Sequence, residues 1–464
     1  MSHRSREPAV IDVVNPTTEE VIGTVRAGTP GDVDAAVTRA VAAFPAWSAT
    51  SLETRLAVVR GVADALAART DSLAATMTAE MGTPITFASR VQVPNPVGIA
   101  RGVADVLAGG YFDGEEIGNS LVLREPIGVV AAITPWNFPL QQMIAKVVPA
   151  LAAGNVVVLK PSELAPMTAD LLASVLTSVL ADAGAPEGVF SVVHGTGPVV
   201  GEALAVHPMV DMVSFTGSTR AGRRVAALAA ETVKRVALEL GGKSANVVLD
   251  DADLTRAVKI GVANAFMNNG QACSAWTRLL VPASLHDQAL EIAVAAASKY
   301  EPGDPALPTT RIGPAVSAAQ RDRVVGYIRQ GISEGAKLAL GGPERPTDRG
   351  FHVAPTVFGS VLPDMTIAQE EIFGPVLSVL PYTDDDDAVR IANSTIYGLG
   401  GAVFSADPAR ALSIAKRLRT GQVDINGAAF NTNAPFGGYR QSGTGREFGR
   451  HGLDEFTELK SIQH

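Results

Sequence analysis

Short apolar segments alternate with longer helical patterns through the middle of this chain, and no other feature restricts the fold as strongly. Most of these segments lack the polar alternation of a half-exposed strand, so they predict strands buried on both faces. Buried strands separated by helices favour a parallel, doubly wound α/β sheet. The first series occupies residues 128–134, 155–160, 189–194, 209–215 and 235–240.

A second series follows Glu239. It begins with a predicted strand at 244–249, a helix at about 253–266 and a strand at 278–281, and the alternation continues from 286 to about 406. A chain of 464 residues is too long for one ordinary core, and its length favours roughly two to four domains. We therefore predict two doubly wound α/β sheets.

The residues before these two series predict other structures. Residues 10–26 form an extended stretch, and residues 30–81 carry apolar residues at helical spacing after an N-cap near Thr29 or Asp32. Residues 109–126 combine a turn with a strand pattern. This combination favours a projecting hairpin.

Charge and composition argue against several classes of partner. The formal net charge is −9 with a pI near 5.4, whereas nucleic acids and anionic membranes require clustered positive charge. The most apolar run, 147–159, is too short to span a bilayer, and residues 1–8 are not followed by the apolar core of a signal peptide. One cysteine excludes an intrachain disulfide, and the seven histidines show no metal-ligand spacing. We expect a soluble cytoplasmic protein without a metal site.

The single cysteine, Cys273, lies in a loop predicted between a helix and a strand. Asn268, Asn269, Gly270 and Gln271 supply backbone amides and flexibility just before it. A thiolate is the strongest nucleophile among the ordinary side chains, and it needs a polar, partly open setting. A lone cysteine is more often a small buried hydrophobe. The residue by itself therefore leaves both interpretations open.

Residues 215–219 run from a strand end through a small-residue turn into a helix that begins near Arg220. Such a helix start aims free amides and the positive end of the helix dipole at a phosphate, although an ordinary capped helix fits equally well. The glycine segment 195–201 has the wrong spacing for the standard dinucleotide fingerprint. The acidic run 384–387 predicts a solvated helix start rather than a metal cluster.

Seven motifs, in a fixed order, resemble those of the aldehyde dehydrogenase superfamily of NAD(P)-dependent, non-phosphorylating oxidoreductases. The resemblance extends from about residue 10 to residue 461. One such motif is weak evidence, but seven in the family's order are highly specific. They are Pro-Trp-Asn-Phe-Pro at 135–139, Lys-Pro-Ser-Glu at 160–163, Phe-Thr-Gly-Ser-Thr at 215–219, Glu-Leu-Gly-Gly-Lys at 239–243, Gly-Gln-Ala-Cys at 270–273, Glu-Ile-Phe-Gly-Pro at 371–375 and Pro-Phe-Gly-Gly at 435–438.

The resemblance implies that Cys273 attacks an aldehyde and forms a thiohemiacetal, because the carbonyl carbon must become electron-rich before it can lose hydride. In the family, the side-chain amide that matches Asn137 and the cysteine backbone N–H stabilise the oxyanion. Glu239 matches the general base that hydrolyses the resulting thioester. Its position at the end of a buried strand favours a pKa raised by desolvation. A turn asparagine and a surface glutamate are the structural alternatives for Asn137 and Glu239.

The resemblance also implies a cofactor site. Lys160 and Glu163 match residues that hold the adenosine ribose, and Ser218 matches a pyrophosphate contact. A carboxylate at the ribose repels a 2′-phosphate, so Glu163 favours NAD, while Arg220 leaves NADP open. The predicted cofactor residues are Thr134, Trp136, Lys160, Ser162, Glu163, Phe215, Thr216, Gly217, Ser218, Leu240, Gly241 and, at the nicotinamide half, Glu371 and Phe373.

The predicted aldehyde site has a mostly neutral lining. It contains no obvious arginine for a substrate carboxylate and no aromatic box for a quaternary ammonium group. We therefore expect a medium-sized neutral aliphatic or aromatic aldehyde. The predicted substrate residues are Phe138, Gln142, Ala272, Ser274, Phe430 and Phe436, and Ala145 and Trp276 also align with the family's entrance tunnel.

The family's architecture implies three units. A discontinuous cofactor domain comprises residues 1–108 and 128–240, and a catalytic domain comprises residues 241–441. Residues 109–127 and 442–464 form a bridging element that adds strands to a partner's sheet, which implies a homodimer or homotetramer.

Two other functions stay open. A coenzyme A-acylating or phosphorylating relative makes a different product from the same thioester. Members that acylate coenzyme A generally lack a carboxylate at the position of Glu239, which favours hydrolysis to the free acid. A non-catalytic binding or structural role is the second alternative. The joint presence of Cys273, Glu239 and Asn137 argues against it.

Overall fold

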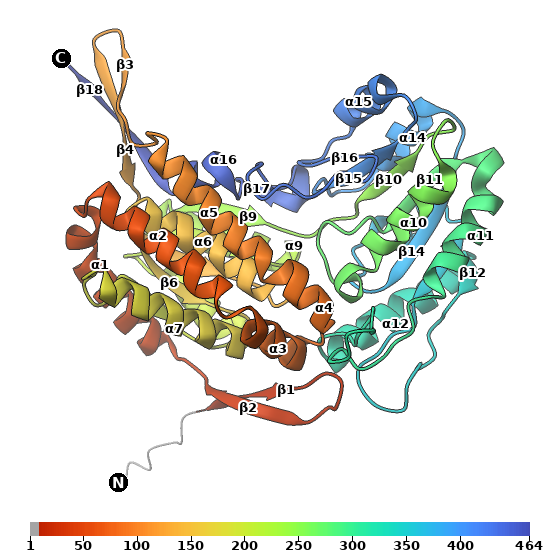
Figure 1. Ribbon diagram of the computed structural model, residues 1–464, viewed down its shortest axis with the longest axis horizontal. Helices are drawn as coiled ribbons and strands as arrows, with labels where there is room; N and C mark the ends of the chain where they lie inside the picture. The colour runs from red at the N-terminus through yellow and green to blue at the C-terminus, as the bar shows by residue number, and fades with distance from the viewer. Residues whose placement is uncertain (1–8) are drawn as a thin grey trace.

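The computed structural model describes residues 9–464 and has two lobes, each built on one parallel-dominated sheet (Figure 1). In the first lobe the strand order is β17-β9-β8-β5-β6-β7, and only β17 is antiparallel to its neighbour. The strands are β5 (Val129–Ile133), β6 (Val156–Lys160), β7 (Phe190–Val192), β8 (Met212–Thr216), β9 (Arg235–Glu239) and β17 (Gly443–Thr444). These strands confirm the first predicted series.

The second lobe has the strand order β12-β13-β14-β11-β10-β15-β16, with β12 antiparallel and the others parallel. The alternation that begins after Glu239 therefore forms a second doubly wound sheet, as predicted. Its strands are β10 (Ala245–Val248), β11 (Arg278–Pro282), β12 (Lys337–Leu340), β13 (Thr356–Gly359), β14 (Val376–Tyr382), β15 (Gly401–Phe404) and β16 (Asp424–Ile425).

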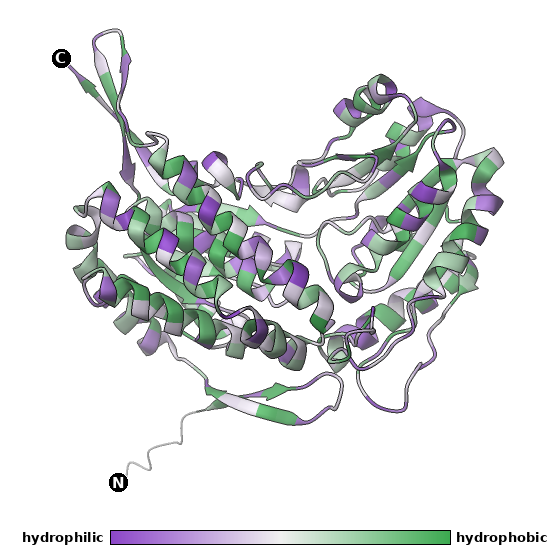
Figure 2. Cartoon of the chain, in the orientation of Figure 1, coloured by the Kyte–Doolittle hydropathy of each residue, from purple (hydrophilic) through white to green (hydrophobic). Residues whose placement is uncertain are grey.

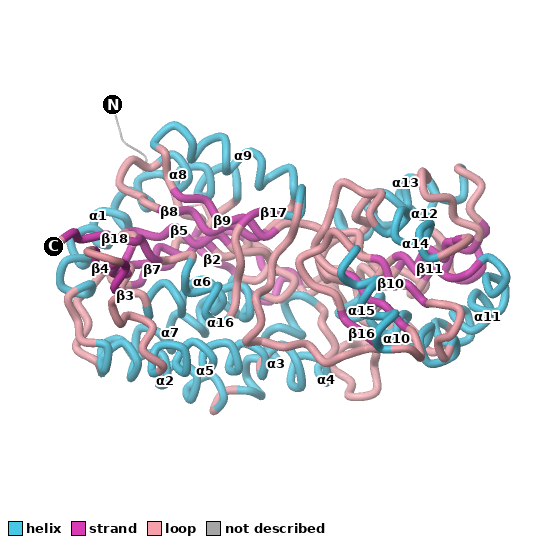
Figure 3. Tube along the Cα trace, turned by 90° about the horizontal axis from the view of Figure 1, so that it is seen from above, coloured by secondary structure: helices cyan, strands magenta, loops and turns pink. Residues whose placement is uncertain are grey.

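Helices cover both faces of the first sheet. Figure 3 shows α8 and α9 on one side, and α2, α5, α6 and α7 on the other. Every residue of α6 is buried, because it lies between the sheet and the outer layer of α2 and α5. In Figure 2 these outer helices carry both hydrophilic and hydrophobic residues, as one face in the core and one in water requires. The bounds are α1 (Pro30–Ser48), α2 (Leu52–Ala67), α3 (Thr70–Met81), α4 (Ile85–Phe87), a π-helical turn (Ala88–Gln92), α5 (Pro94–Ala108), α6 (Pro139–Ala152), α7 (Pro166–Asp182), α8 (Glu202–Val206), α9 (Thr219–Ala229) and α16 (Gly449–Asp454).

The second sheet separates two apolar clusters. Adjacent residues of β10 contribute to opposite clusters, Val247 to one and Val248 to the other, as the alternation of side chains along a strand requires. Helices α10 and α11 pack against one face, and the remaining helices pack against the other. The bounds are α10 (Leu254–Ala265), α11 (His286–Ala297), α12 (Ala318–Ser333), α13 (Thr366–Gln369), α14 (Asp385–Ala392) and α15 (Pro408–Arg417).

Local signals set several helix starts. Thr29 is the N-cap of α1, and the side chain of Asp32 accepts a hydrogen bond from its backbone, so the two predicted capping residues form one capping box. Asp384 caps α14, which confirms that the acidic run is a helix start. Within residues 9–464, no helix is long and apolar enough to cross a membrane, and no three His, Cys, Asp or Glu side chains are grouped to hold a metal.

Two small antiparallel sheets lie outside the main layers. Strands β1 (Val10–Val14) and β2 (Val21–Arg26) form a hairpin, and Glu19 in its turn pairs with Arg345 of the second lobe at 2.6 Å. Strands β3 (Glu115–Ile117), β4 (Ser120–Pro126) and β18 (Thr457–Gln463) form a projecting three-stranded sheet (Figure 1). This sheet agrees with the hairpin predicted at 109–126.

The segment 442–464 is divided between two sheets. Strand β17 joins the first-lobe sheet because its backbone pairs with β9, whereas β18 pairs with β4. Of this segment, β18 therefore belongs to the sheet of the predicted hairpin, and β17 does not. The predicted boundary at 240/241 falls between β9 and β10, the strands that belong to different sheets. The three-domain division itself stays a prediction, and its first eight residues lie outside the described range.

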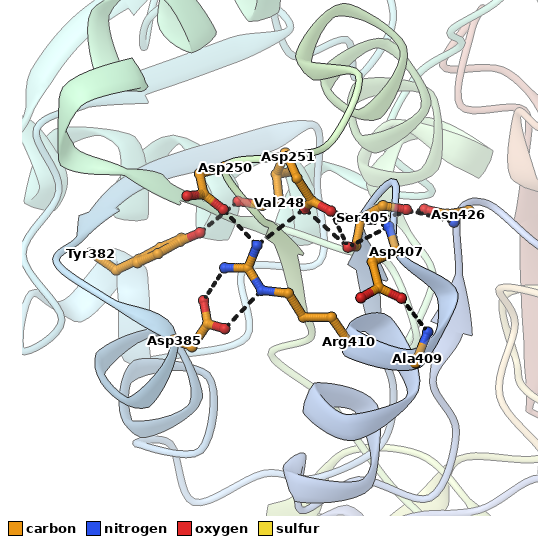
Figure 4. A network of polar contacts seen from close by, with 10 residues as sticks. All are labelled: Val248, Asp250, Asp251, Tyr382, Asp385, Ser405, Asp407, Ala409, Arg410 and Asn426. Carbon is orange, nitrogen blue, oxygen red and sulfur yellow. Dashed lines mark hydrogen bonds and ion pairs between the residues drawn. The ribbon is translucent and has the colours of Figure 1, made fainter.

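A polar network closes one end of the second sheet. Figure 4 shows Arg410 of α15 between Asp385 of α14 and Asp250 after β10, with ion-pair distances of 2.7 Å and 2.6 Å. Asp251 accepts hydrogen bonds from Ser405 and from the backbone of Asp407, the N-cap of α15. These groups are partly exposed, so each pair adds little stability by itself. Together they fix the start of α15 against the sheet.

Arg278 supplies a more buried link and a test of the second lobe. Its guanidinium donates hydrogen bonds to the carbonyls of Lys243, Ile391 and Ala392 at 2.7 to 2.9 Å. We expect Arg278→Met to lower the free energy of unfolding by about 3 kcal/mol, since it leaves buried carbonyls without donors. Urea denaturation measures this change. Arg417→Met, which removes an exposed ion pair, should change it by less than about 0.5 kcal/mol, and equal losses would contradict the special role of Arg278.

Candidate active site

The predicted cofactor residues of the first lobe gather at one edge of its sheet. They follow or end β5, β6, β8 and β9, and backbone hydrogen bonds join neighbouring ends: Thr134 donates to Lys160 at 3.1 Å, and Gly217 donates to Glu239 at 3.1 Å. Open α/β sheets bind ligands outside the carboxyl ends of their strands. The buried members of this set are Thr134, Lys160, Ser162, Phe215, Thr216 and Leu240.

The turn after β8 leads directly into α9. Ser218 is the N-cap, and its hydroxyl accepts a hydrogen bond from the N–H of Ala221 at 3.3 Å. A side chain at Gly217 would meet the ring of Phe215 at 2.6 Å, so this turn requires a glycine. The predicted strand, turn and helix are confirmed. Arg220 lies exposed in the first turn of α9.

Lys160 and Glu163 form an ion pair at 3.1 Å beside this edge. The lysine is buried, which lowers its pKa, while the carboxylate of Glu163 opposes the shift. Glu163 is partly exposed, so its carboxylate remains accessible from solvent. The pair therefore presents one buried cation and one open carboxylate, a combination that suits hydroxyl groups better than a phosphate.

Glu371 and Phe373 approach the same edge from the second lobe. The carboxylate of Glu371 accepts a hydrogen bond from the N–H of Gly242 at 3.0 Å, and burial raises its pKa to about 7. A side chain at Gly241 would collide with this carboxylate. The ring of Phe373 meets that of Trp136 edge to face, with centroids 5.4 Å apart. Glu371 and Phe373 of the second lobe therefore contact residues at this edge of the first sheet.

The Cys273 loop follows a turn of unusual backbone geometry. Asn268, Asn269 and Gly270 all have positive φ, at 50°, 61° and 72°. Such a conformation is strained for asparagine and is retained only where the surroundings hold it. The side chain of Asn269 does so by donating to the carbonyls of Gly82 and Pro314 at 3.1 and 3.0 Å. The loop lies between α10 and β11, as predicted.

Cys273 is a residue of intermediate exposure. Burial of the sulfur raises its pKa well above the ordinary value, and the carboxylates of Glu239, Glu371 and Glu447 raise it further. The predicted open position is therefore present, but the surroundings do not favour a resting thiolate. The thiol is protonated at neutral pH, and the thiolate is a minor, strongly basic form.

Glu239 is the last residue of β9 and is only 3% exposed. Neither carboxylate oxygen has a hydrogen-bond partner among the described residues. Burial raises its pKa, Glu447 adds to the rise, and Lys146 opposes it. The predicted direction of the pKa shift is confirmed, and the alternative of a surface glutamate is wrong because the whole side chain is buried.

Asn137 is also 3% exposed and lies between β5 and α6, whose first residue is Pro139. Its Nδ2 donates to the carbonyl of Gln271 at 3.2 Å. This bond joins the Asn137 segment to the Cys273 loop, two residues before the thiol. Because a side-chain amide has two N–H groups, the second one is available to another acceptor.

A cavity of about 1080 Å³ opens onto the thiol. Cys273 and Trp276 belong to its wall, together with all six predicted substrate residues, while Ala145 lies elsewhere in the core. Asn137 and Glu239 do not line this cavity. The predicted substrate residues in the wall are Phe138, Gln142, Ala272, Ser274, Phe430 and Phe436.

The cavity wall also contains charged residues that the sequence did not place there, Arg90, Arg311 and Asp424. Both arginines are exposed and therefore solvated, and Asp424 accepts a hydrogen bond from Gln422 at 3.0 Å. The sequence showed no obvious arginine for a substrate carboxylate, whereas the wall contains two exposed arginines. Arg90 and Arg311 come from segments distant in sequence from every motif, so no local pattern indicates them.

Lys146 and Glu447 form a buried ion pair at 2.5 Å behind Glu239. Sequence reasoning missed both as site residues. A single cation within the apolar helix 139–152 was the available signal for Lys146, whereas Glu447 lies in a polar segment that indicates nothing. Their contact joins residues 301 positions apart. The pair supplies the two largest charge effects on the pKa of Glu239.

Comparison with known proteins now decides the family. The model of the family described as "Aldehyde dehydrogenase family" matches residues 3–462. The chain belongs to the aldehyde dehydrogenase family.

Two relatives illustrate how close this membership is. The chain is 50% identical over 454 residues to 3-succinoylsemialdehyde-pyridine dehydrogenase from a Pseudomonas species, covering 97% of this chain and 94% of that protein. It is 49% identical to aldehyde dehydrogenase C of Pseudomonas syringae, solved as a cysteine-to-alanine mutant in complex with NAD+ and octanal. The two structures superpose with a TM-score of 0.96 and cover 98% of this chain and 94% of that one.

A third solved structure is the indole-3-acetaldehyde dehydrogenase of P. syringae in complex with NAD+ and IAA. It is 39% identical with a TM-score of 0.94, and the match covers 98% of this chain and 93% of that one. The chain is therefore an oxidoreductase of the aldehyde dehydrogenase family, whose reaction is the oxidation of an aldehyde to the acid. The predicted family and enzyme class are confirmed.

The buried charges behind Glu239 predict a pH effect. Removing the negative charge of Glu447 with Glu447→Gln lowers the pKa of both Glu239 and Cys273, because Glu447 raises both. A role as nucleophile for Cys273 or as base for Glu239 would need the deprotonated form. The rising limb of the pH–rate profile should therefore move to lower pH, by about one unit.

Steady-state NADH formation from pH 5 to 10 measures this limb. Glu458→Gln removes an exposed carboxylate of β18 and should leave the limb in place. A limb that stays at the parent position in Glu447→Gln would contradict the electrostatic assignment.

Proposed function

We propose that this enzyme oxidises a neutral aliphatic or aromatic aldehyde to the free carboxylic acid with NAD+, using Cys273 as the nucleophile and Glu239 as the base that hydrolyses the thioester. One observation carries the proposal. The only cysteine faces a large cavity, while a buried carboxylate without a partner and a side-chain amide lie behind it.

The first step is attack by Cys273 on the aldehyde carbon, which forms a C–S bond and an oxyanion. A thiolate with a raised pKa is scarce at neutral pH but intrinsically more nucleophilic. The second N–H of Asn137 and the backbone N–H of Cys273 are the donors for the oxyanion. Donors fixed by protein, rather than by mobile water, are worth about 2.7 to 4 kcal/mol each.

The residues at the strand ends of the first sheet suit NAD+, because they combine a helix start, a buried lysine and an open carboxylate. When bound, NAD+ accepts the hydride that the adduct loses, and a thioester remains on Cys273. We assign Lys160 and Glu163 to the adenosine ribose and the amides at the start of α9 to the pyrophosphate. Glu371 and Phe373 hold the nicotinamide half. The open carboxylate of Glu163 favours NAD+ over NADP+, and the NAD+ complexes of the two related structures agree with this preference.

Hydrolysis of the thioester needs a deprotonated water. Glu239 is suited to this step because its raised pKa makes it a stronger base than an ordinary carboxylate. It has no hydrogen-bond partner that a water would have to displace. A carboxylate in this position favours hydrolysis over transfer of the acyl group to coenzyme A.

The substrate proposal follows from the cavity. Its volume and aromatic wall suit an aldehyde with a long alkyl chain or a ring. The charged members of the wall do not change this class, because both arginines are exposed to water and Asp424 accepts a hydrogen bond from Gln422. The names of the related proteins agree, since they include octanal, indole-3-acetaldehyde and a pyridine semialdehyde.

We also propose that the protein forms a homo-oligomer and is located in the cytoplasm. The projecting sheet of β3, β4 and β18 exposes apolar residues, including Leu459 and Ile462. A second copy of the chain that covers this sheet would form a homodimer or homotetramer. A single cysteine and no disulfide fit a cytoplasmic protein.

An aldehyde panel tests the reaction. We expect NADH formation from octanal and from phenylacetaldehyde, slower reaction with NADP+, and release of the free acid whether or not coenzyme A or phosphate is added. Cys273→Ala should form no NADH while binding NAD+ as the parent does. An acyl-coenzyme A product would favour the acylating alternative, and turnover by Cys273→Ala would overturn the nucleophile.

Glu239→Gln tests the base. Hydrolysis needs Glu239 at the moment of water attack, whereas the thiolate of Cys273 can form by exchange with solvent. Stopped-flow measurements should therefore show an NADH burst that is retained, followed by a steady state slowed by about 100-fold or more. Equal slowing of the two phases would argue against Glu239 as the deacylating base.

A further inference from the structure

Gln92 is a buried glutamine whose side chain meets three separate segments. It ends the π-helical turn between α4 and α5 and is 1% exposed. Its Nε2 lies 3.1 Å from Thr83 Oγ1, 3.2 Å from Asn268 Oδ1 and 3.4 Å from the carbonyl oxygen of Asn137. π-Helical turns often occur at functional sites. Gln92 thus connects the segment before α4, the Asn137 segment and the turn before Cys273.

Asn268 completes this connection. Its Nδ2 donates to the carbonyl of Asn137 at 2.8 Å and approaches that of Gln271 at 3.3 Å, while its Oδ1 accepts from Gln92. The amide of Gln92 therefore orients the amide of Asn268, which in turn bonds the Asn137 segment. The two loops that carry Asn137 and Cys273 are held together by this pair of side chains.

The spacing of these two loops matters for the reaction. An oxyanion needs both of its donors within hydrogen-bond distance, about 2.7 to 3.1 Å. Here one donor belongs to Asn137 and the other to the backbone of Cys273, which lie on different lobes. The positive φ of Asn268 and Asn269 makes their turn strained, so it requires fixed partners to keep its shape.

Packing alone does not explain why a glutamine occupies position 92. Its Oε1 is buried without a hydrogen-bond partner among the described residues, and such a group costs about 1 to 3 kcal/mol. An apolar side chain of similar size would avoid this penalty, so the N–H groups are the feature that offsets it. Gln92 is absent from the wall of the aldehyde cavity, although Arg90, Val91 and Asn95 line it. Any effect of Gln92 on the reaction must therefore pass through the residues that it contacts.

We propose that Gln92 is a positioning residue that sets the distance between the Asn137 amide and the Cys273 loop, so that both oxyanion donors meet one oxygen. The inference rests on the proposed role of Asn137 and adds the residue that holds it. Thr83 anchors Gln92 on the opposite side through its hydroxyl.

Gln92→Glu tests the proposal because a carboxylate has nearly the same shape and cannot donate. We expect kcat/KM for octanal to fall by about tenfold or more, less than the loss of a direct oxyanion donor, which is about 10² to 10³. The Kd for NAD+ and the rate of alkylation of Cys273 by iodoacetamide should stay within about twofold, since alkylation forms no oxyanion.

Two further variants control for charge and folding. Gln92→Met removes the donors without adding a charge and should show the same loss, and thermal unfolding reports whether each variant is folded. Gln330→Glu changes an exposed glutamine of α12 and should leave kcat/KM unchanged.

A double-mutant cycle with Asn137→Ala decides between positioning and general structural support. If Gln92 acts through Asn137, adding Gln92→Glu to Asn137→Ala should cost no more than about twofold. The same loss in both backgrounds, or an equal fall in the alkylation rate, would overturn the proposal. Loss of activity in Asn137→Ala with full activity in Gln92→Glu would refute only the role of Gln92, whereas full activity in Asn137→Ala would refute the proposed oxyanion role itself.

Discussion

The site depends on how the chain holds the buried carboxylate of Glu239, which has no hydrogen-bond partner among the described residues. A charged group in this position is unfavourable unless the surroundings hold it. Strand β17 pairs with β9 at this residue, and Ser442 accepts from the backbone of Leu240 and donates to that of Gly241. A segment from the end of the chain therefore fixes the strand end that carries Glu239.

The electrostatic surroundings raise the pKa of both groups. Burial and neighbouring carboxylates act in this direction at Cys273 and at Glu239, while Lys146 and the Cys273 thiol oppose the rise at Glu239. A raised pKa lowers the fraction of each group that is deprotonated in the free enzyme. The thiolate or carboxylate that does form is a stronger nucleophile or base within a partly desolvated space.

The residues proposed to take part in the reaction come from both lobes. The first lobe provides Asn137 and Glu239 at the ends of its strands, while the second provides Cys273, Glu371 and Phe373. Hydrogen bonds made by buried amides cross this boundary, from Asn137 to Gln271 and from Asn268 to Asn137. The strained turn before Cys273 is thus held from both sides, which limits the relative movement of the two loops.

Local sequence patterns account for the two parallel sheets and for the residues at their strand ends. Apolar runs, helix caps and small-residue turns act over a few neighbouring positions, so Thr29, Ser218 and Cys273 lie where these patterns predicted. The other features of the site arise from long-range packing. The Lys146–Glu447 pair, the contacts of Gln92 and the split of 442–464 between β17 and β18 join residues far apart in the chain. Such contacts depend on how complete elements pack, and no local pattern records that packing.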